Sequence, residues 1–248
     1  RLGVGAFVIE LETALFRRKI DVAVHSLKDL PTIPTPGLQI AAVTPRQDPR
    51  DCLIDQWNLP IDKLPRGARI GTGSPRRTSQ ILHLRPDLSV LPIRGNIDTR
   101  LRKANGDDFD GIVVAMAGLI RLGMQDEVTQ PFDTHLMVPA PGQGALALQC
   151  RDEDEDLASI LTSVSDPFTT VTVHAERLLL SKLGGGCQLA LGAHASVEGD
   201  VLKLTAFLGK ESGTPVFKVT ETGSIGDAEI VANQVYLELM RQGAVVEE

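Results

Sequence analysis

The segment GTGSPRR at 71–77 places two glycines ahead of two adjacent arginines. Ser74 is a typical N-cap residue and Pro75 a typical first residue of a helix. Glycine exposes backbone N–H groups, and a helix N-terminus adds partial positive charge. The guanidinium forks of Arg76 and Arg77 suit carboxylates. We predict an anion site here, with a capped helix carrying two exposed arginines as the alternative.

A second segment, RGNIDTR at 94–100, also follows an expected strand. Gly95 allows the backbone to approach a ligand closely. Arg94 and Arg100 are separated by one to two helical turns and can face the same cleft. Arg121, beyond the next expected strand, is a further candidate, although an arginine on a helix surface is an equally good interpretation.

The third segment is HSLKD at 25–29, at the end of another expected strand. Lys28 can hold an anion, and the adjacent Asp29 offers a carboxylate for proton transfer or for stabilising a cation. A plain strand-to-loop turn is the alternative for the segment. His25 is equally consistent with a hydrogen-bonded core histidine.

The chain has three cysteines, an odd number at wide spacing, which predicts neither a disulfide framework nor a CxxC metal site. Cys187 follows three glycines, where a thiol is expected to be partly accessible, but composition alone favours an inert thiol. Cys52 and Cys150 have apolar neighbours and are expected to be inert packing residues.

The expected elements alternate between strands and helices in the first two thirds of the chain, which predicts α/β architecture with parallel sheets covered on both faces. A segment with two prolines at 44–50 and a segment rich in proline and glycine at 138–144 predict two crossings between domains. After residue 167, strands bracketed by helices predict a small α+β domain. The expected strands are 21–24, 38–43, 68–70, 88–93, 111–115, 145–149, 193–197, 201–208 and 216–222, with a hairpin turn at 198–200; the expected helices are 7–17, 156–162, 169–183 and 228–241, with others beginning at 75 and 118 and a short one after 96.

The 248 residues carry a net charge of −7, but the charge is unevenly distributed. The window 66–103 holds nine basic and two acidic residues, a net of +7, which leaves −14 on the rest. A local basic field in an acidic protein suits a small polyanionic ligand better than nucleic acid. No apolar run approaches the ~18–20 residues that span a bilayer, so no membrane partner is expected.

Seven segments in this order resemble the porphobilinogen deaminase family, whose members are also called hydroxymethylbilane synthases. The resemblance runs from about Gly5 to the C-terminus. The segments are VHSLKDLP at 24–31, DPRD at 48–51, GTGSPRR at 71–77, IRGN at 93–96 with Thr99 and Arg100, AGL at 117–119, PGQGA at 141–145 and GGGCQ at 184–188.

The resemblance implies a dipyrromethane cofactor joined by a thioether to Cys187, contrary to the inert thiol that composition favours. It implies that Asp29 is the catalytic carboxylate and that Gln143 belongs to an interdomain hinge. Implied cofactor contacts are Ser26, Lys28, Thr72, Ser74, Arg76 and Arg77, and implied substrate contacts are Arg94, Arg100 and Arg121; no metal is implied.

The implied reaction condenses four porphobilinogen molecules on the cofactor, with loss of ammonia through an azafulvene-like cation, and then releases linear hydroxymethylbilane by hydrolysis. Six rings carry twelve carboxylates, and burying that charge demands cations. The basic window supplies them. The chain must shift by one ring in each cycle, which predicts domain and loop movement.

The implied fold has two domains similar to type 2 periplasmic binding proteins, with mainly parallel sheets, plus the small α+β domain. We expect domain 1 over 1–44 and 145–163, domain 2 over 45–144, and domain 3, carrying the cofactor cysteine, over 164–248. Family members have a strand and helix before this point, so we expect an N-terminally incomplete chain. Val4 in GVG replaces a usual lysine, and GSP at 73–75 replaces a usual Ser-Ser-Leu.

A non-enzymatic binding module for a small anion is the alternative function. Two linked pyrroles on Cys187 would indicate the enzyme, and a bare thiol the module. We expect a monomer in the cytoplasm, or in the plastid of a plant or alga, with porphobilinogen as its small-molecule partner.

Overall fold

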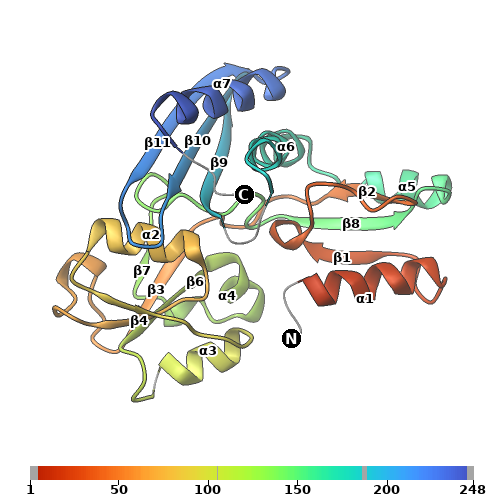
Figure 1. Ribbon diagram of the computed structural model, residues 1–248. Helices are drawn as coiled ribbons and strands as arrows, with labels where there is room; N and C mark the ends of the chain where they lie inside the picture. The colour runs from red at the N-terminus through yellow and green to blue at the C-terminus, as the bar shows by residue number, and fades with distance from the viewer. Residues whose placement is uncertain (1–4, 105, 186–188, 245–248) are drawn as a thin grey trace.

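The computed structural model describes residues 5–104, 106–185 and 189–244, arranged around three sheets (Figure 1). The first sheet has the order β1-β8-β2, and both outer strands run antiparallel to β8. Helix α1 contacts β1, and α5 contacts β2. The bounds are α1 Gly5–Phe16, β1 Ala23–Ser26, β2 Leu38–Val43, β8 Leu146–Arg151 and α5 Glu155–Thr162.

The second sheet has the order β5-β4-β6-β3-β7 and is covered on both faces. Successive residues of β3 enter different cores: Leu53 packs with Ile81 of α2, whereas Cys52 packs with Leu119 of α4. This alternation is what a strand buried on both faces requires. The bounds are β3 Asp51–Asp55, β4 Arg69–Gly71, α2 Pro75–Leu84, β5 Ser89–Leu91, α3 Ile97–Ala104, β6 Gly111–Ala115, α4 Met116–Leu122 and β7 Gln130–Pro131.

The third sheet is an antiparallel meander in the order β11-β10-β9. Alternate strand residues such as Ala193, Leu204 and Val219 share one core with α6 and α7, which cover that face. The expected hairpin turn is confirmed: Val201 pairs with Glu198, and the turn glycine, Gly199, has a φ of 59°. The bounds are α6 Pro167–Lys182, β9 Ala190–Glu198, β10 Val201–Gly209, β11 Val216–Ser224 and α7 Ala228–Arg241.

The α/β class with an α+β C-terminal part is confirmed, but the prediction of mainly parallel sheets is wrong. Among the described strands, only the ladders of β4 with β5 and β4 with β6 are parallel. In the third sheet the other ladders are antiparallel because short connections join successive strands, and in the first two sheets they are antiparallel because β3 and β8 each enter directly from a crossing segment. A strand that arrives in this way needs no crossover helix and can run against its neighbours.

Three short 3-10 turns, η1 (Leu27–Asp29), η2 (Ile61–Lys63) and η3 (Gln125–Glu127), join larger elements. The turn η1 follows β1, which begins two residues later than predicted. The first strand therefore ends at Ser26 and delivers residues 27–29 to the space between the first two sheets. No described helix is long and apolar enough to cross a membrane.

Candidate active site

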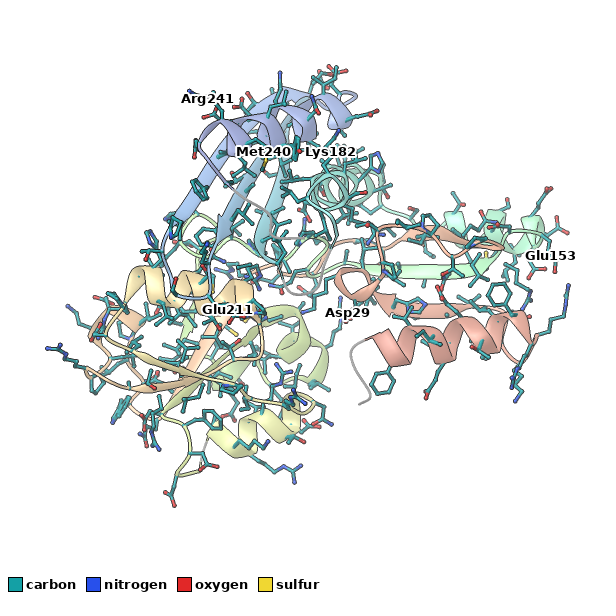
Figure 2. The ribbon with its side chains drawn as sticks, in the orientation of Figure 1. Asp29, Glu153, Lys182, Glu211, Met240 and Arg241 are labelled. Carbon is teal, nitrogen blue, oxygen red and sulfur yellow. The ribbon has the colours of Figure 1, made fainter. Side chains whose placement is uncertain are left out.

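A cavity of about 380 Å³ lies where the first and second sheets face each other. Its walls come from the end of β1 and η1, from α2, α3 and α4, from the end of β6, and from the second crossing segment. Figure 2 shows Asp29 between the two lobes of the molecule. The lining residues are Ser26, Lys28, Asp29, Arg77, Gly95, Asn96, Ile97, Arg100, Val114, Ala115, Ala117, Gly118, Arg121, Gly142, Gln143, Gly144 and Ala145.

Asp29 and Lys28 reach the cavity because η1 is fixed beneath them. Leu27 is 1% exposed and packs with Val8 and Val173, and its N–H donates to the carbonyl of Ala145 at 3.0 Å. The plain strand-to-loop interpretation is therefore insufficient, because the turn presents both charged groups to the cavity. His25 is buried and its Nε2 lies 2.9 Å from Gln149 Oε1, as expected for a core histidine.

Burial moves the pKa values of these two groups toward each other. Burial raises the pKa of the Asp29 carboxyl, and electrostatic interactions, chiefly with the charge of Lys28, oppose that rise. Burial, helped by the charge of Arg77, lowers the pKa of Lys28 to about 8 against the pull of Asp29 and Asp51. A carboxyl with a raised pKa beside an ammonium with a lowered one is an arrangement suited to proton transfer.

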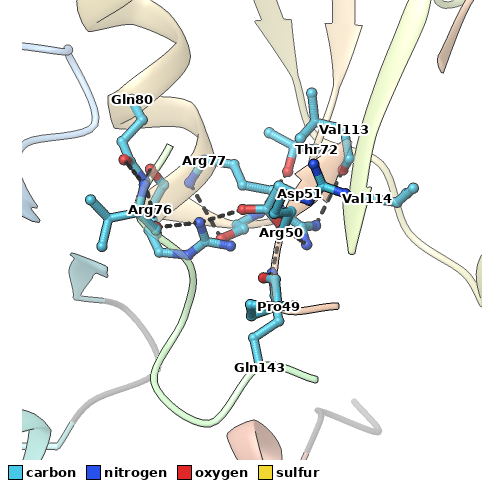
Figure 3. A network of polar contacts seen from close by, with 12 residues as sticks. Pro49, Arg50, Asp51, Thr72, Arg76, Arg77, Gln80, Val113, Val114 and Gln143 are labelled. Atoms are coloured by element: carbon cyan, nitrogen blue, oxygen red, sulfur yellow. Dashed lines mark hydrogen bonds and ion pairs between the residues drawn. The ribbon is translucent and has the colours of Figure 1, made fainter. Parts of the chain in front are cut away.

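Asp51, at the start of β3, is the centre of the polar network in Figure 3. Its carboxylate is 0% exposed and accepts from Arg76 Nη1 at 2.5 Å and from Arg77 Nη2 at 2.7 Å. Burial alone would raise the pKa of Asp51, but the two guanidinium groups hold it well below its usual range. Gln143 Nε2 completes the network with a 2.9 Å bond to Asp51 Oδ1.

This network corrects the alternative of two exposed arginines, because Arg76 and Arg77 are 4% and 5% exposed. Only Arg77 lines the cavity. Arg76 Nη1 also donates to the carbonyl of Val138 at 2.8 Å, so it ties α2 to the second crossing segment. Sequence reasoning missed Asp51 as a functional residue. The available signal was a carboxylate opening the apolar run at 52–54, where burial demands a partner.

Thr72 and Ser74 shape the entry to α2 and are not among the cavity-lining residues. The expected cap is confirmed: Ser74 Oγ accepts from the N–H of Arg77 at 3.4 Å, with Pro75 beginning the helix. Thr72 is buried, and its Oγ1 accepts from the N–H of Ser74 at 3.3 Å. Both hydroxyls therefore orient the helix that carries the two arginines.

The predicted substrate arginines separate into two groups. Arg100 lines the cavity and donates through Nε to Gly95 O at 2.8 Å; burial first, and then the charge of Arg77, lower its pKa. Arg121 also lines the cavity and donates to Gly144 O at 2.8 Å. Arg94 is exposed and is not among the lining residues.

Gln143 lies in the second crossing segment and is 1% exposed. Its Nε2 donates to Pro49 O at 2.7 Å in the first crossing, and its Oε1 accepts from Lys28 Nζ at 3.4 Å. Its carbonyl accepts from Arg46 Nε at 2.8 Å. One side chain thus contacts both crossings and the turn that carries Asp29.

Cys187 lies outside the described residues, so the structure does not place its thiol. Upstream, a Cβ on Gly185 would stand 3.1 Å from Thr32 Oγ1, which puts this end of the loop beside the segment following η1. Cys52 and Cys150 are buried, as expected for packing residues, and burial raises the pKa of Cys52 to about 12. Within the described ranges, no group of three or more His, Cys, Asp or Glu side chains is placed to hold a metal.

The cavity fits a polycarboxylate group. Among its described lining residues, four cationic side chains surround one carboxylate, that of Asp29. The hydrogen bonds of Arg100 and Arg121 given above engage one donor each, whereas a guanidinium has five. The remaining donors suit acetate and propionate groups.

Two family models match the chain. "Porphobilinogen deaminase, dipyromethane cofactor binding domain" covers residues 2–159, and "Porphobilinogen deaminase, C-terminal domain" covers 170–241. The chain belongs to the porphobilinogen deaminase family. This family membership makes it an enzyme, a transferase of tetrapyrrole biosynthesis with a dipyrromethane cofactor, as the resemblance implied.

Curated porphobilinogen deaminases from bacteria are close in sequence. The protein from Acidothermus cellulolyticus is 47% identical over 246 residues, which are 98% of this chain and 74% of the relative. The one from Corynebacterium efficiens is 46% identical over 247 residues, 98% of this chain and 82% of the relative. The match to Bacillus thuringiensis is 47% over 244 residues, 98% and 78% of the two chains.

Solved structures similar to the chain include solute-binding proteins. A lipoprotein of the YaeC family from Enterococcus faecalis is 13% identical with a TM-score of 0.34, covering 62% of this chain and 65% of that one. A TRAP periplasmic solute binding protein from Desulfovibrio salexigens is 13% identical with a TM-score of 0.36, and the match covers 63% of this chain and 60% of that one. Scores this low carry no argument about the fold of a porphobilinogen deaminase.

Proposed function

We propose that the cavity is where this member of the porphobilinogen deaminase family condenses four porphobilinogen molecules, one after another, and then releases linear hydroxymethylbilane by hydrolysis. The observation that carries the proposal is the placement of Asp29. Within the described part of the cavity wall it is the one carboxylate, set among Lys28, Arg77, Arg100 and Arg121. Cys187 would hold the dipyrromethane, whose free pyrrole position would accept the first unit, and each later unit would join the ring added before it.

Asp29 is the catalytic residue of this proposal. Its carboxylate stabilises the cationic pyrrole nitrogen that develops when ammonia leaves porphobilinogen, and it accepts the proton that is lost after the new bond forms. The raised pKa of Asp29 favours the second role, because a more basic carboxylate accepts a proton more readily.

The cations divide the remaining work by position. Lys28, Arg77, Arg100 and Arg121 pair with cofactor and substrate carboxylates, while Ser26 offers a hydroxyl at the same wall. Thr72, Ser74 and Arg76 act indirectly, because they orient α2 and hold Arg77 at the cavity. Arg94 lies outside the cavity lining, and we propose that it contacts the growing oligopyrrole only when that product extends beyond the cavity.

The hinge role of Gln143 is part of the same proposal. Its contacts with Asp51, Pro49 and Lys28 join both crossings to the catalytic turn. The boundaries 1–44 with 145–163, 45–144 and 164–248 remain our prediction for the three domains. We further propose a monomer acting in the cytoplasm, or in a plastid, with porphobilinogen as its partner and neither nucleic acid nor membrane involved.

Stoichiometry tests the function. The purified chain is incubated with porphobilinogen, and substrate, ammonia and linear product are measured together. We expect one ammonia for each porphobilinogen consumed and one hydroxymethylbilane for every four. Binding of porphobilinogen without consumption would overturn the proposal and support the binding module instead.

A further inference from the structure

Arg177, on helix α6 beneath the third sheet, reaches across to the turn that carries Asp29. Its Nη1 donates to Leu30 O at 3.1 Å and to Leu27 O at 3.4 Å. Its Nη2 donates to Pro31 O at 2.6 Å. In Figure 1, α6 lies between the third sheet and the loop that follows β1. One guanidinium thus donates hydrogen bonds to three backbone carbonyls, which lie before and after Lys28 and Asp29 in the sequence.

A turn of this kind needs such a partner. The three residues of η1 close a single internal backbone bond, from Leu30 N to Leu27 O at 3.2 Å, so most of its carbonyls have no partner within the turn. The fork of an arginine can serve several carbonyls at once, which an ammonium cannot do with the same rigidity.

The apolar side of the turn is fixed by the same helix. Val173 lies one helical turn before Arg177 and packs against Leu27 and Leu30 in a buried cluster. On the opposite side, a Cβ on Gly142 would stand 3.1 Å from Leu27 Cγ and 3.3 Å from Lys28 N. The turn is therefore held between α6 and the second crossing segment, with little room to shift.

Helix α6 also ends a few positions before the cofactor cysteine in the sequence. Its last residue, Lys182, precedes Cys187 by five positions. The same helix therefore holds the catalytic turn through Arg177 and leads into the loop that carries the thiol. Neither task requires Arg177 to touch a substrate.

We infer that Arg177 is a positioning residue, which holds the Asp29 turn in register with the cofactor-bearing end of α6. The inference rests on the proposed function, because it assigns to α6 the alignment of Asp29 with the ring held on Cys187. Arg177 acts through backbone carbonyls and not through the charge of Asp29. Its loss therefore moves the turn and leaves the three arginines of the cavity lining, Arg77, Arg100 and Arg121, in place.

The test compares Arg177→Leu and Arg177→Lys with Arg85→Leu. Arg85 is a matched control, because its Nη atoms cap carbonyls of Ile61 and Leu64, at the turn η2, with bonds of 2.7 and 3.0 Å. That turn lies outside the cavity lining. Amide hydrogen exchange is followed in the peptide covering 27–31, and kcat and KM for porphobilinogen are measured on the same cofactor-loaded samples.

We expect Arg177→Leu to accelerate exchange in 27–31 and to lower kcat by about ten- to a hundredfold, with KM within about twofold of wild type, because a small misplacement costs turnover more than binding. Arg177→Lys should give exchange rates and kcat values between those of wild type and Arg177→Leu. Arg85→Leu should change neither the exchange in 27–31 nor kcat. If Arg177→Leu does not fold, Arg177→Lys decides.

Unchanged exchange in 27–31 in a folded Arg177 variant would overturn the inference, as would a kcat no lower than that of Arg85→Leu. Failure of the proposed function gives a different result. In that case the wild-type chain would consume no porphobilinogen, while the Arg177 variants would still show faster exchange in 27–31. Arg177 would then still hold the turn in place, but the turn would have no catalytic role.

Discussion

Asp29 and Lys28 occupy successive positions of one turn, and burial acts on their pKa values in opposite directions. It raises that of Asp29 and lowers that of Lys28 to about 8. The carboxyl is the group that can move a proton, and the ammonium is the group whose charge can be lost within the working pH range. The two residues therefore give separable predictions.

Replacing the carboxyl by an amide tests the role of Asp29. Asp29→Asn keeps the size of the side chain but removes the negative charge and the proton acceptor. We expect kcat to fall by about 10²–10⁴-fold, the range of a general acid–base contribution. Steady-state turnover measures kcat, and intact mass under denaturing conditions shows whether the cofactor is still attached.

The cofactor should remain on the Asp29→Asn protein, because the cations that bind its carboxylates are unchanged. A variant that turns over at the wild-type rate would remove Asp29 from the mechanism. Loss of the cofactor together with activity would instead assign Asp29 to cofactor attachment.

The charge of Lys28 gives a pH dependence with a definite sign. Because its folded pKa is about 8, Lys28 is charged below that pH and neutral above it in the ligand-free cavity. Binding of an anion favours the charged form, so affinity for a small dicarboxylate should fall as pH rises through about 8. The affinity is measured by calorimetric titration of the cofactor-free Cys187→Ser protein. The titrations cover a range of roughly 1.5 pH units below and above the pKa of Lys28.

Lys28→Arg is the matched variant, since arginine stays charged throughout this range. Its affinity should lose the dependence near pH 8. An equal decline in both proteins would show that Lys28 is not the group responsible.

At the scale of elements, the N-terminal end of α2 is joined to β3 by one buried carboxylate and two buried guanidinium groups. Asp51, Arg76 and Arg77 lie at 0, 4 and 5% exposure. Taking such charges out of water is costly unless each has a partner. The network is therefore sensitive to removal of its single anion.

We predict that Asp51→Asn destabilises the protein by ~3–5 kcal/mol, as expected when one partner of a buried ion pair is removed. Chemical denaturation of the loaded protein measures the free energy of unfolding. Asp48→Asn is the control, because Asp48 pairs with the more exposed Arg50 in the same crossing. If Asp51→Asn lowers the free energy of unfolding by no more than Asp48→Asn does, the network does not make the proposed contribution to stability.

Sequence patterns predicted most elements and the residues that carry chemistry, but not how those residues pair. The cap formed by Ser74 and Pro75 is local, so four residues sufficed to predict it. The partner of Arg76 and Arg77 lies 25 and 26 positions away, on a strand that the periodicity did not reveal. The parallel order of the sheets was wrong for a similar reason, because the direction of β3 and β8 depends on how the crossings fold.

The candidate site follows the same rule. Lys28, Asp29, Arg77, Arg100 and Arg121 share one cavity, as the resemblance led us to expect, although no local pattern places them together. Arg94 is exposed and lies outside the lining of this cavity, so its contact with substrate stays a prediction. The hydrogen bonds from Arg177 to the catalytic turn join residues ~150 positions apart, and no sequence motif predicted them.

At the scale of the whole molecule, three sheets are held together through the crossing segments. Glu176 of α6 is fully buried and binds Arg46 of the first crossing at 2.7 Å. It also accepts from the N–H of Gly142 in the second crossing and from that of Ala195 in β9, each at 2.7 Å. The third sheet is thereby fastened to the same segments that border the cavity.

The volume of the cavity bears on how the product grows. About 380 Å³ is near the lower end of the ~300–1,000 Å³ typical of small-molecule sites. A chain of six rings requires more, so the walls must separate as units are added. The crossings at 44–50 and 138–144 are where we expect that movement, since they alone connect the first sheet to the second.

The central claim is that a covalent primer on Cys187 is elongated in this cavity, and intact mass under denaturing conditions tests it most directly. The purified wild-type chain and Cys187→Ser are compared before and after addition of porphobilinogen. We predict that wild type carries the added mass of two linked pyrroles, that substrate adds further single-unit increments, and that Cys187→Ser shows neither. A wild-type protein with the mass of its bare sequence, unchanged by substrate, would contradict the claim.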